Sequence, residues 1–213
     1  YSMRSISKGI IFDFDGVVVD SVSIKTKAFA ELYKHHGDKI VQKVIKFHEN
    51  NGGVSRYEKI RFFTEQYLNI EPNQIDIMNS AEKFSSLVVD EVIKAPYITG
   101  AFDYITKVSK DHKLFISTGT PQDEILKILE GRGISHFFTQ VYGSPEAKTF
   151  HIDKIKNDYS FNSKDLTFFG DSSTDLEAAS LKNVQFILVK NIYNEHISKS
   201  YNGKKIENFL EIL

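Results

Sequence analysis

In the stretch GIIFDFDGVVVDS, residues 9–21, an apolar run stops abruptly at two carboxylates and a glycine. Residues 9–12 are continuously apolar, which is typical of a strand buried on both faces of a parallel sheet. Asp13 and Asp15 follow two residues apart. Ligands of open α/β sheets bind beyond the carboxyl ends of strands, so we expect a functional site where this first strand ends.

Four more apolar runs have the length of strands: KLFIST (113–118), FTQVYG (138–143), LTFFGD (166–171) and VQFILV (184–189). Helical patterns separate them. One is TPQDEILKILEGRG (120–133), in which we expect Thr120 to be the N-cap and Pro121 the first helical residue. Another is STDLEAASLK (173–182). This alternation predicts an α/β fold with a doubly wound, Rossmann-like parallel sheet.

The part of the chain between the first two strands has no strand pattern. Its segments 25–36, 39–49, 55–68 and 72–93 all fit helices. We interpret this block as an all-helical cap inserted into the core. The expected domains are therefore a Rossmann-like catalytic core of residues 1–20 and 94–213, and a helical cap of residues 21–93.

Composition restricts the classes of function. A length of 213 residues suits one domain with a modest insertion. The net charge of −1 favours neither nucleic acid nor a membrane surface as partner. No signal-peptide pattern occurs, and the absence of cysteine removes disulfides, thiolate metal sites and a cysteine nucleophile. We expect a cytoplasmic protein that acts on a small molecule.

A second acidic motif repeats the design of the first. LTFFGDSSTD, residues 166–175, is an apolar run followed by Gly170, Asp171 and Asp175. If the two strands are neighbours, these carboxylates converge with Asp13 and Asp15. Carboxylates that lie close together repel one another, so they need a nearby positive charge to remain ionised together. Mg²⁺ is a hard cation that prefers oxygen ligands, so the sequence predicts a magnesium site.

Two further segments supply groups suited to a phosphate. FISTGT ends in Thr118 and Gly119, whose hydroxyl and backbone N–H can hold phosphate oxygens. Lys148, in GSPEAKTF, adds a positive charge. Together with the acids, these residues suit phosphoryl transfer, in which one carboxylate attacks phosphorus and a second moves the proton.

The motifs DFDGVVVDS and GDSSTDLEAA, with Thr118 and Lys148 between them, resemble the four motifs of the haloacid dehalogenase superfamily. The likeness spans the chain and is nearest to the phosphoglycolate-phosphatase-like and β-phosphoglucomutase-like members. It implies that Thr118 and Lys148 bind the phosphoryl group. True dehalogenases lack the acid at position 15, so the resemblance implies phosphate chemistry. One departure is Thr149, which stands where the family commonly has proline after the lysine.

The resemblance also implies a role for each acid. Asp13 is the nucleophile that forms an aspartyl-phosphate, and it ligates the metal. Asp15 is the general acid and base, and its backbone carbonyl is a metal ligand. Asp171 ligates the metal, and Asp175 supports it either directly or through water or Lys148.

The segment HENNGGVSRYEK, residues 48–59, interrupts the helical pattern of the expected cap. In capped relatives a loop of this kind enters the active site and contacts the leaving group. We therefore expect Arg56 to contact the substrate, with Lys59 as a second candidate. His48 shows no metal-ligand spacing, and we interpret it as a surface or core residue.

Three functions remain open from the sequence. The leading one is a Mg²⁺-dependent phosphatase of small phosphate monoesters. A phosphomutase of sugar phosphates would use the same motifs. A non-catalytic phospho-acceptor module, similar to bacterial receiver domains, is the third. Against it stand the acid–x–acid pair on the first strand and the helical block expected over the site.

Overall fold

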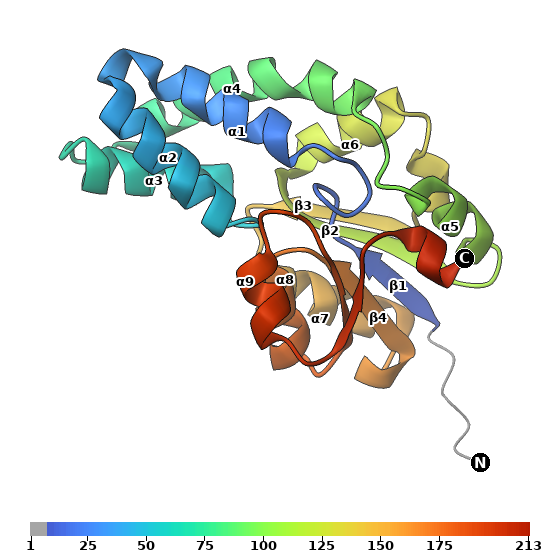
Figure 1. Ribbon diagram of the computed structural model, residues 1–213. Helices are drawn as coiled ribbons and strands as arrows, with labels where there is room; N and C mark the ends of the chain where they lie inside the picture. The colour runs from blue at the N-terminus through green and yellow to red at the C-terminus, as the bar shows by residue number, and fades with distance from the viewer. Residues whose placement is uncertain (1–7) are drawn as a thin grey trace.

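The computed structural model describes residues 8–213, which form a parallel sheet between helical layers (Figure 1). The sheet has six strands in the order β3-β2-β1-β4-β5-β6, and every neighbouring pair is parallel. The strands are β1 (Gly9–Phe12), β2 (Lys113–Pro121), β3 (Gln140–Ser144), β4 (Leu166–Gly170), β5 (Gln185–Val189) and β6 (Lys204–Ile206). The expected α/β fold with a Rossmann-like sheet is confirmed.

The central strand β1 shows why its sequence is continuously apolar. Ile10 and Phe12 belong to the core on one face of the sheet, whereas Ile11 belongs to the core on the other face. All three are at most 2% exposed. Both faces are therefore covered, as in other parallel sheets of α/β proteins.

Helices cover the two faces separately. On one face lie α5 (Ala101–Val108) and α6 (Gln122–Gly131), and on the other lie α7 (Lys148–Tyr159), α8 (Ser173–Leu181) and α9 (Glu195–Ser200). Short 3₁₀ turns occupy Lys34–His36, Ser135–Phe137, Ser163–Asp165 and Phe209–Ile212. These helices therefore cover the faces of the sheet, as in a doubly wound fold.

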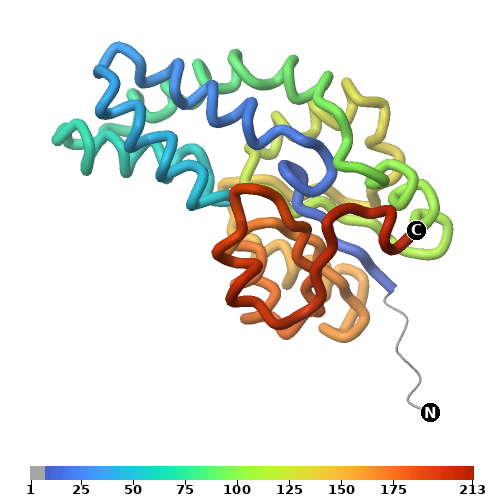
Figure 2. The backbone as a smooth tube through the Cα atoms, viewed as in Figure 1, coloured from blue at the N-terminus to red at the C-terminus, as the bar shows by residue number. Residues whose placement is uncertain are grey.

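The helical block forms a layer of its own beyond the end toward which β1 points (Figures 1 and 2). Its helices are α1 (Val22–Tyr33), α2 (Asp38–Asn50), α3 (Arg56–Phe62), which continues as a π-helical turn over Phe63–Tyr67, and α4 (Gln74–Lys94). Phe29, Phe63 and Phe84 pack together inside it. We refer to α1–α4 as the cap. The domain boundaries expected at residues 20 and 94 stay a prediction, and residues 1–7 lie outside the described part.

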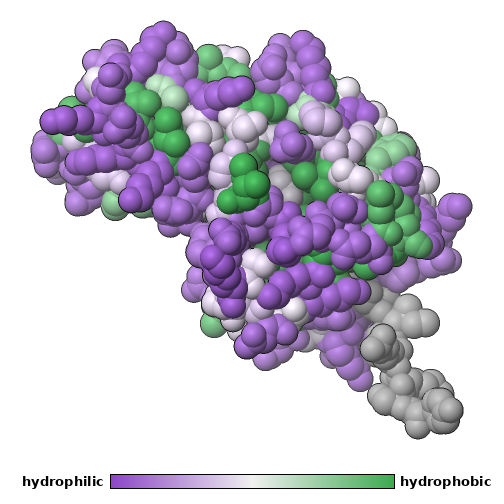
Figure 3. Space-filling view, viewed as in Figure 1, coloured by the Kyte–Doolittle hydropathy of each residue, from purple (hydrophilic) through white to green (hydrophobic). Residues whose placement is uncertain are grey.

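Within residues 8–213, no helix is both long enough and apolar enough to cross a membrane. The face drawn in Figure 3 is mostly hydrophilic, with apolar side chains in small separate groups.

Candidate active site

The two acidic motifs meet because β1 and β4 are neighbours in the sheet, with Phe12 paired to Phe169. Asp13 and Asp171 therefore leave adjacent strand ends. One carboxylate oxygen from each of Asp13, Asp171 and Asp175 lies within 4.8 Å of the others. At the carboxyl edge of the sheet, three of the four acids expected to converge therefore do so, and the side chain of the fourth, Asp15, lies outside this group.

The glycine after the first acidic pair has a specific steric role. Gly16 has a φ of 77°, and a Cβ placed there would lie 2.2 Å from Asp171 Oδ2. Side chains rarely adopt this backbone conformation and no Cβ would fit. Gly16 thus allows the loop after β1 to pass directly against the Asp171 carboxylate.

Lys148 joins the acids from the opposite side. It is the first residue of α7, and its buried ammonium donates to Asp13 Oδ2 at 3.0 Å and to Asp175 Oδ1. Burial alone would lower the pKa of Lys148, but the two carboxylates raise it above its ordinary value. Lys148 is therefore a permanent positive charge beside Asp13.

Asp175 is saturated with hydrogen bonds. Its Oδ2 accepts the backbone N–H groups of Asp171 and Ser172 at 3.2 and 3.0 Å, and the Ser172 hydroxyl at 2.6 Å. Its Oδ1 accepts the Lys148 ammonium. Asp175 therefore holds the Asp171 loop and Lys148 in place.

The donor set fits a divalent cation. Three carboxylates face one ammonium, so the cluster retains excess negative charge. Burial and then repulsion from Asp175 raise the pKa of Asp13 to about 7. Burial, with Asp13 and Asp175, raises the pKa of Asp171 well above its usual range. Buried carboxylate oxygens that repel one another are suitable ligands for Mg²⁺.

Asp15 lies in different surroundings, and its side chain is not part of this cluster. It accepts hydrogen bonds from Ser21 at 2.6 Å, from Lys25 at 2.5 Å and from the Thr120 hydroxyl at 3.1 Å. Burial raises the pKa of Asp15, but Lys25 and these hydrogen bonds lower it below its ordinary value overall. Asp15 is therefore held as an anion whose direction is fixed.

The expected capping role of Thr120 is wrong. Strand β2 continues through Pro121, which is itself the N-cap residue of α6. The Thr120 hydroxyl instead contacts Asp15 and the Lys25 ammonium across the strand ends. A tertiary contact here replaces the local cap.

The predicted phosphate-binding residues lie at the end of β2. Thr118 is 1% exposed, and its hydroxyl accepts the backbone N–H of Thr120 at 3.2 Å. A Cβ on Gly119 would lie 2.6 Å from the carbonyl oxygen of Gly53, so the loop between α2 and α3 closes directly over this position. The cap loop thus enters the site, as the sequence predicts.

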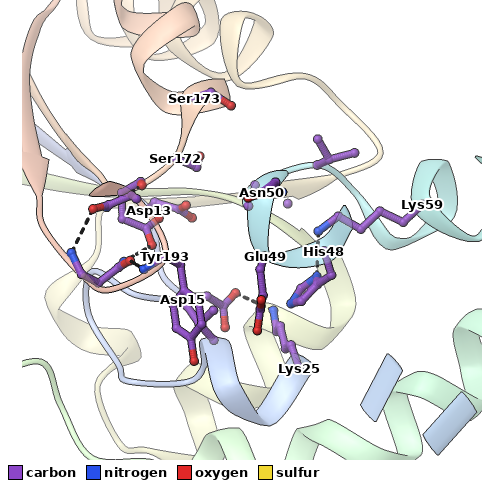
Figure 4. Close-up of a pocket in the computed structure, with 18 of the residues that line it drawn as sticks. Asp13, Asp15, Lys25, His48, Glu49, Asn50, Lys59, Ser172, Ser173 and Tyr193 are labelled. Atoms are coloured by element: carbon purple, nitrogen blue, oxygen red, sulfur yellow. Dashed lines mark hydrogen bonds and ion pairs between the residues drawn. The ribbon is translucent and has the colours of Figure 1, made fainter. Parts of the chain in front are cut away.

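A pocket that opens to solvent lies between the cap and the strand ends. Its walls include three of the four acidic motif residues, Asp13, Asp15 and Asp171, together with Thr118 and Gly119. Figure 4 shows Asp13 and Asp15 on one side of the pocket and His48 and Lys59 on the other.

The cap residues expected to contact the substrate both line this pocket, but each already has a partner. The Arg56 guanidinium forms a two-pronged ion pair with Glu124 of α6, at 2.5 and 2.8 Å. The Lys59 ammonium contacts His48 Nδ1 at 2.9 Å. His48 is buried as well, so it belongs to the pocket wall and not to the surface.

Sequence reasoning missed Lys25, Asn191 and Asn194. Asn191 donates to Asp171 Oδ2 at 2.8 Å, and Asn194 donates to the Asp171 carbonyl at 2.8 Å. Both follow the end of β5, so the rule applied to the acids would also have found them. Lys25 has no such signal, because only the approach of α1 to β1 places it near Asp15.

The comparisons with known proteins agree with this site. The sequence model of the haloacid dehalogenase-like hydrolases matches residues 10–189. A search of curated proteins finds no significant match. Among solved structures, a haloacid dehalogenase-like family protein from Streptococcus pneumoniae is 20% identical, with a TM-score of 0.73 over 99% of this chain and 98% of the other.

Two further structures resemble the whole chain. A predicted phosphoglycolate phosphatase from Haemophilus somnus is 18% identical, with a TM-score of 0.77 over 99% of this chain and 98% of the other. A β-phosphoglucomutase from Clostridium difficile is 20% identical, with a TM-score of 0.78 over 98% and 94%. At these identities the likeness shows the fold. The family match covers most of the chain and every acidic motif, so the protein belongs to the haloacid dehalogenase-like hydrolases.

Proposed function

We propose that this protein is a Mg²⁺-dependent phosphatase that hydrolyses a small phosphate monoester through an aspartyl-phosphate on Asp13. The observation that supports this most is the different placement of two neighbouring carboxylates. Asp13 lies between Lys148 and the other acids, whereas Asp15 is held by Ser21, Lys25 and Thr120. A nucleophile and a proton carrier need this kind of separation.

The first half of the reaction forms the phosphoenzyme. An oxygen of Asp13 attacks phosphorus, and the bond from phosphorus to the ester oxygen breaks. Asp15 is an anion before the ester binds, so it first takes up a proton from solvent as the ester binds. It then gives this proton to the ester oxygen, and the alcohol leaves neutral. Lys148, with the Thr118 hydroxyl and the Gly119 backbone, binds the phosphoryl oxygens.

The second half releases phosphate. Water attacks phosphorus of the aspartyl-phosphate and gives its proton to Asp15, which frees Asp13 and inorganic phosphate. The residues that would hold Mg²⁺ are Asp13, Asp171 and the Asp15 backbone carbonyl, with Asp175 in support. When bound, the ion supplies positive charge that offsets the phosphoryl oxygens.

A screen of phosphate release over about 100 metabolite esters, with Mg²⁺ present, tests the proposal, because specificity for small molecules depends on a few pocket contacts. We expect release from at least one small monoester and loss of that activity on chelation and in Asp13→Asn. Unchanged turnover in Asp13→Asn would refute the mechanism.

The same screen distinguishes the two alternatives. A phosphomutase shares every motif residue and differs only in whether water or a second hydroxyl reaches the phosphoenzyme. An isomeric phosphate ester formed without free phosphate would identify a mutase. A stable phosphoprotein that turns over no ester would instead favour a phospho-acceptor module.

A further inference from the structure

The cap wall of the pocket carries three cations, and only one of them lacks a counterion. Lys25 pairs with Asp15 at 2.5 Å, and Arg56 pairs with Glu124 at 2.5 Å. Lys59 has no carboxylate within ion-pairing distance anywhere in residues 8–213, although it is only 3% exposed. A buried charge without a counterion is costly, so its retention in a pocket wall needs a reason.

His48 orients Lys59 without neutralising it. Burial, and then the Lys59 ammonium, lower the pKa of His48 well below its ordinary value, so the ring is neutral. Its Nδ1 accepts one Lys59 proton at 2.9 Å. An ammonium has three donors, which leaves Lys59 with donors for a ligand. The His48 Nε2 atom makes no hydrogen bond with any part of residues 8–213.

The charges around Lys59 favour the binding of an anion beside its ammonium group. Burial and then Lys25 lower the pKa of Lys59 to about 7, and Lys148 and Arg56 add to this, whereas Asp15 opposes it. An anion in contact with the Lys59 ammonium would stabilise its charged form. The other lining groups near this wall include the half-buried Glu49, with which no ion pair forms.

The position of Lys59 separates it from the reacting phosphoryl group. It extends from α3 into the side of the pocket opposite Asp13 (Figure 4). The phosphoryl group at Asp13 already has Lys148 as its positive partner. An anion bound at Lys59 would therefore be additional to the phosphoryl group held between Asp13 and Lys148.

We propose that Lys59, positioned by His48, binds a second anionic group of the substrate, a carboxylate or a second phosphate remote from the transferred phosphoryl group. This inference rests on the proposed phosphatase function and narrows it to doubly anionic esters. Arg56, which Glu124 neutralises, is not the recognition residue in this arrangement.

The test uses phosphate esters of three- and six-carbon chains whose far end is methyl, carboxylate or phosphate. We measure kcat/KM for each with the full chain, with Lys59→Met and with Lys46→Met, which changes an exposed lysine of the same cap. The chain should prefer a far-end anion over methyl by about tenfold or more, the worth of one charged hydrogen bond. Lys59→Met should bring that ratio close to one, and Lys46→Met should keep it.

Comparison of the esters with a far-end carboxylate and those with a far-end phosphate identifies which anion is recognised. An equal rate for all far ends in the full chain, or an unchanged ratio in Lys59→Met, overturns the proposal. Lys59→Gln repeats the test should Lys59→Met fail to fold. If no ester releases phosphate, calorimetric binding of the same compounds to Asp13→Asn protein, with and without Lys59→Met, decides the matter. Far-end anions that bind more tightly only when Lys59 is present support the anion site even though the phosphatase proposal has failed, and equal binding refutes it.

Discussion

Asp13 and Asp15 stand two residues apart and yet experience opposite surroundings. Burial and the Asp175 carboxylate raise the pKa of Asp13, whereas Lys25 and two hydroxyls hold the pKa of Asp15 low against the effect of burial. The sequence predicts both acids because their position after a buried strand is local. It does not predict Lys25, since a lysine near the start of a helix is ordinarily a surface residue.

Replacing Lys25 tests how Asp15 is held. Lys25→Met removes the ammonium that contacts Asp15 at 2.5 Å and Thr120 at 2.8 Å. We expect kcat to fall about tenfold to a hundredfold, which is less than the full contribution of a general acid because Asp15 itself remains, with little change in KM. Steady-state kinetics measure this. A change confined to KM would show that Lys25 binds substrate and does not position Asp15.

Lys59 links function to stability. Its pKa of about 7 in the folded protein lies below its ordinary value of 10.5, so the unfolded chain holds more protons between these two pH values. The stability contributed by this residue therefore rises with pH across that window. Lys59→Met, which has no charge to bury, should be more stable at pH 7, by an amount on the order of a few kcal/mol.

Urea unfolding at pH 7 and pH 10 measures this difference in the free energy of unfolding. The advantage of Lys59→Met should shrink as the pH rises, because at pH 10 the folded lysine is neutral and the unfolded lysine has begun to lose its proton. Lys46→Met is the matched control and should show no such trend. If Lys59→Met were more stable than the unaltered protein by the same amount at both pH values, burial would not have lowered the pKa of Lys59.

Helices α3 and α6 are joined by one buried ion pair across the boundary between cap and core. Arg56 begins α3 and Glu124 lies in the first turn of α6, and the Ser85 hydroxyl of α4 donates to Glu124 at 2.5 Å. The sequence predicts both helices from their apolar spacing. It does not predict the ion pair between them, because that depends on how the cap packs against the core.

A double-mutant cycle measures the ion pair. The single variants are Arg56→Met and Glu124→Met. Glu124→Met alone leaves Arg56 buried without a counterion and should cost about 3–5 kcal/mol in the free energy of unfolding. The double variant Arg56→Met/Glu124→Met should recover most of this loss, since an apolar pair leaves no unpaired charge. If the two single effects simply add, the residues are not coupled.

Smaller elements show the limits of sequence reasoning. β6 is three residues long and begins with two lysines, so it offers no apolar run. α7 begins at Lys148 and its apolar residues are few. Thr120 before Pro121 has the form of a helix start, yet its hydroxyl is used by Asp15 and Lys25. In each case contacts distant in the sequence determine the structure.

The closed arrangement of cap and core depends on the loop between α2 and α3. Gly53 has a φ of 79°, and a Cβ there would lie 2.1 Å from the Thr174 hydroxyl of α8. Its carbonyl faces Gly119 at the phosphate-binding end of β2. The α/β sheet and the helical block between its first two strands follow from the sequence pattern, whereas this closure follows only from the packed molecule.

Gly53→Ala should hold the loop away from the core and lower kcat/KM by about a hundredfold, the effect of a small misplacement in an active site. Gly37→Ala is the control, because Gly37 also has a positive φ, of 89°, but nothing lies within 4 Å of its Cβ position. Both variants place an alanine at a positive φ, and only Gly53→Ala adds a clash with Thr174, so the difference between the two variants reports that clash. Equal kinetics in the two variants would show that closure by this loop does not matter.

Trapping the phosphoenzyme directly tests whether Asp13 is the nucleophile that receives the phosphoryl group. The protein is mixed with Mg²⁺ and an ester that it hydrolyses, and the reaction is quenched in acid within milliseconds. The masses of its peptides are then measured by mass spectrometry. We expect one added phosphoryl group, labile to hydroxylamine, on the peptide that contains Asp13, and none in Asp13→Asn. Continued phosphate release with that peptide unmodified, or a phosphoryl group on any other residue, would contradict it.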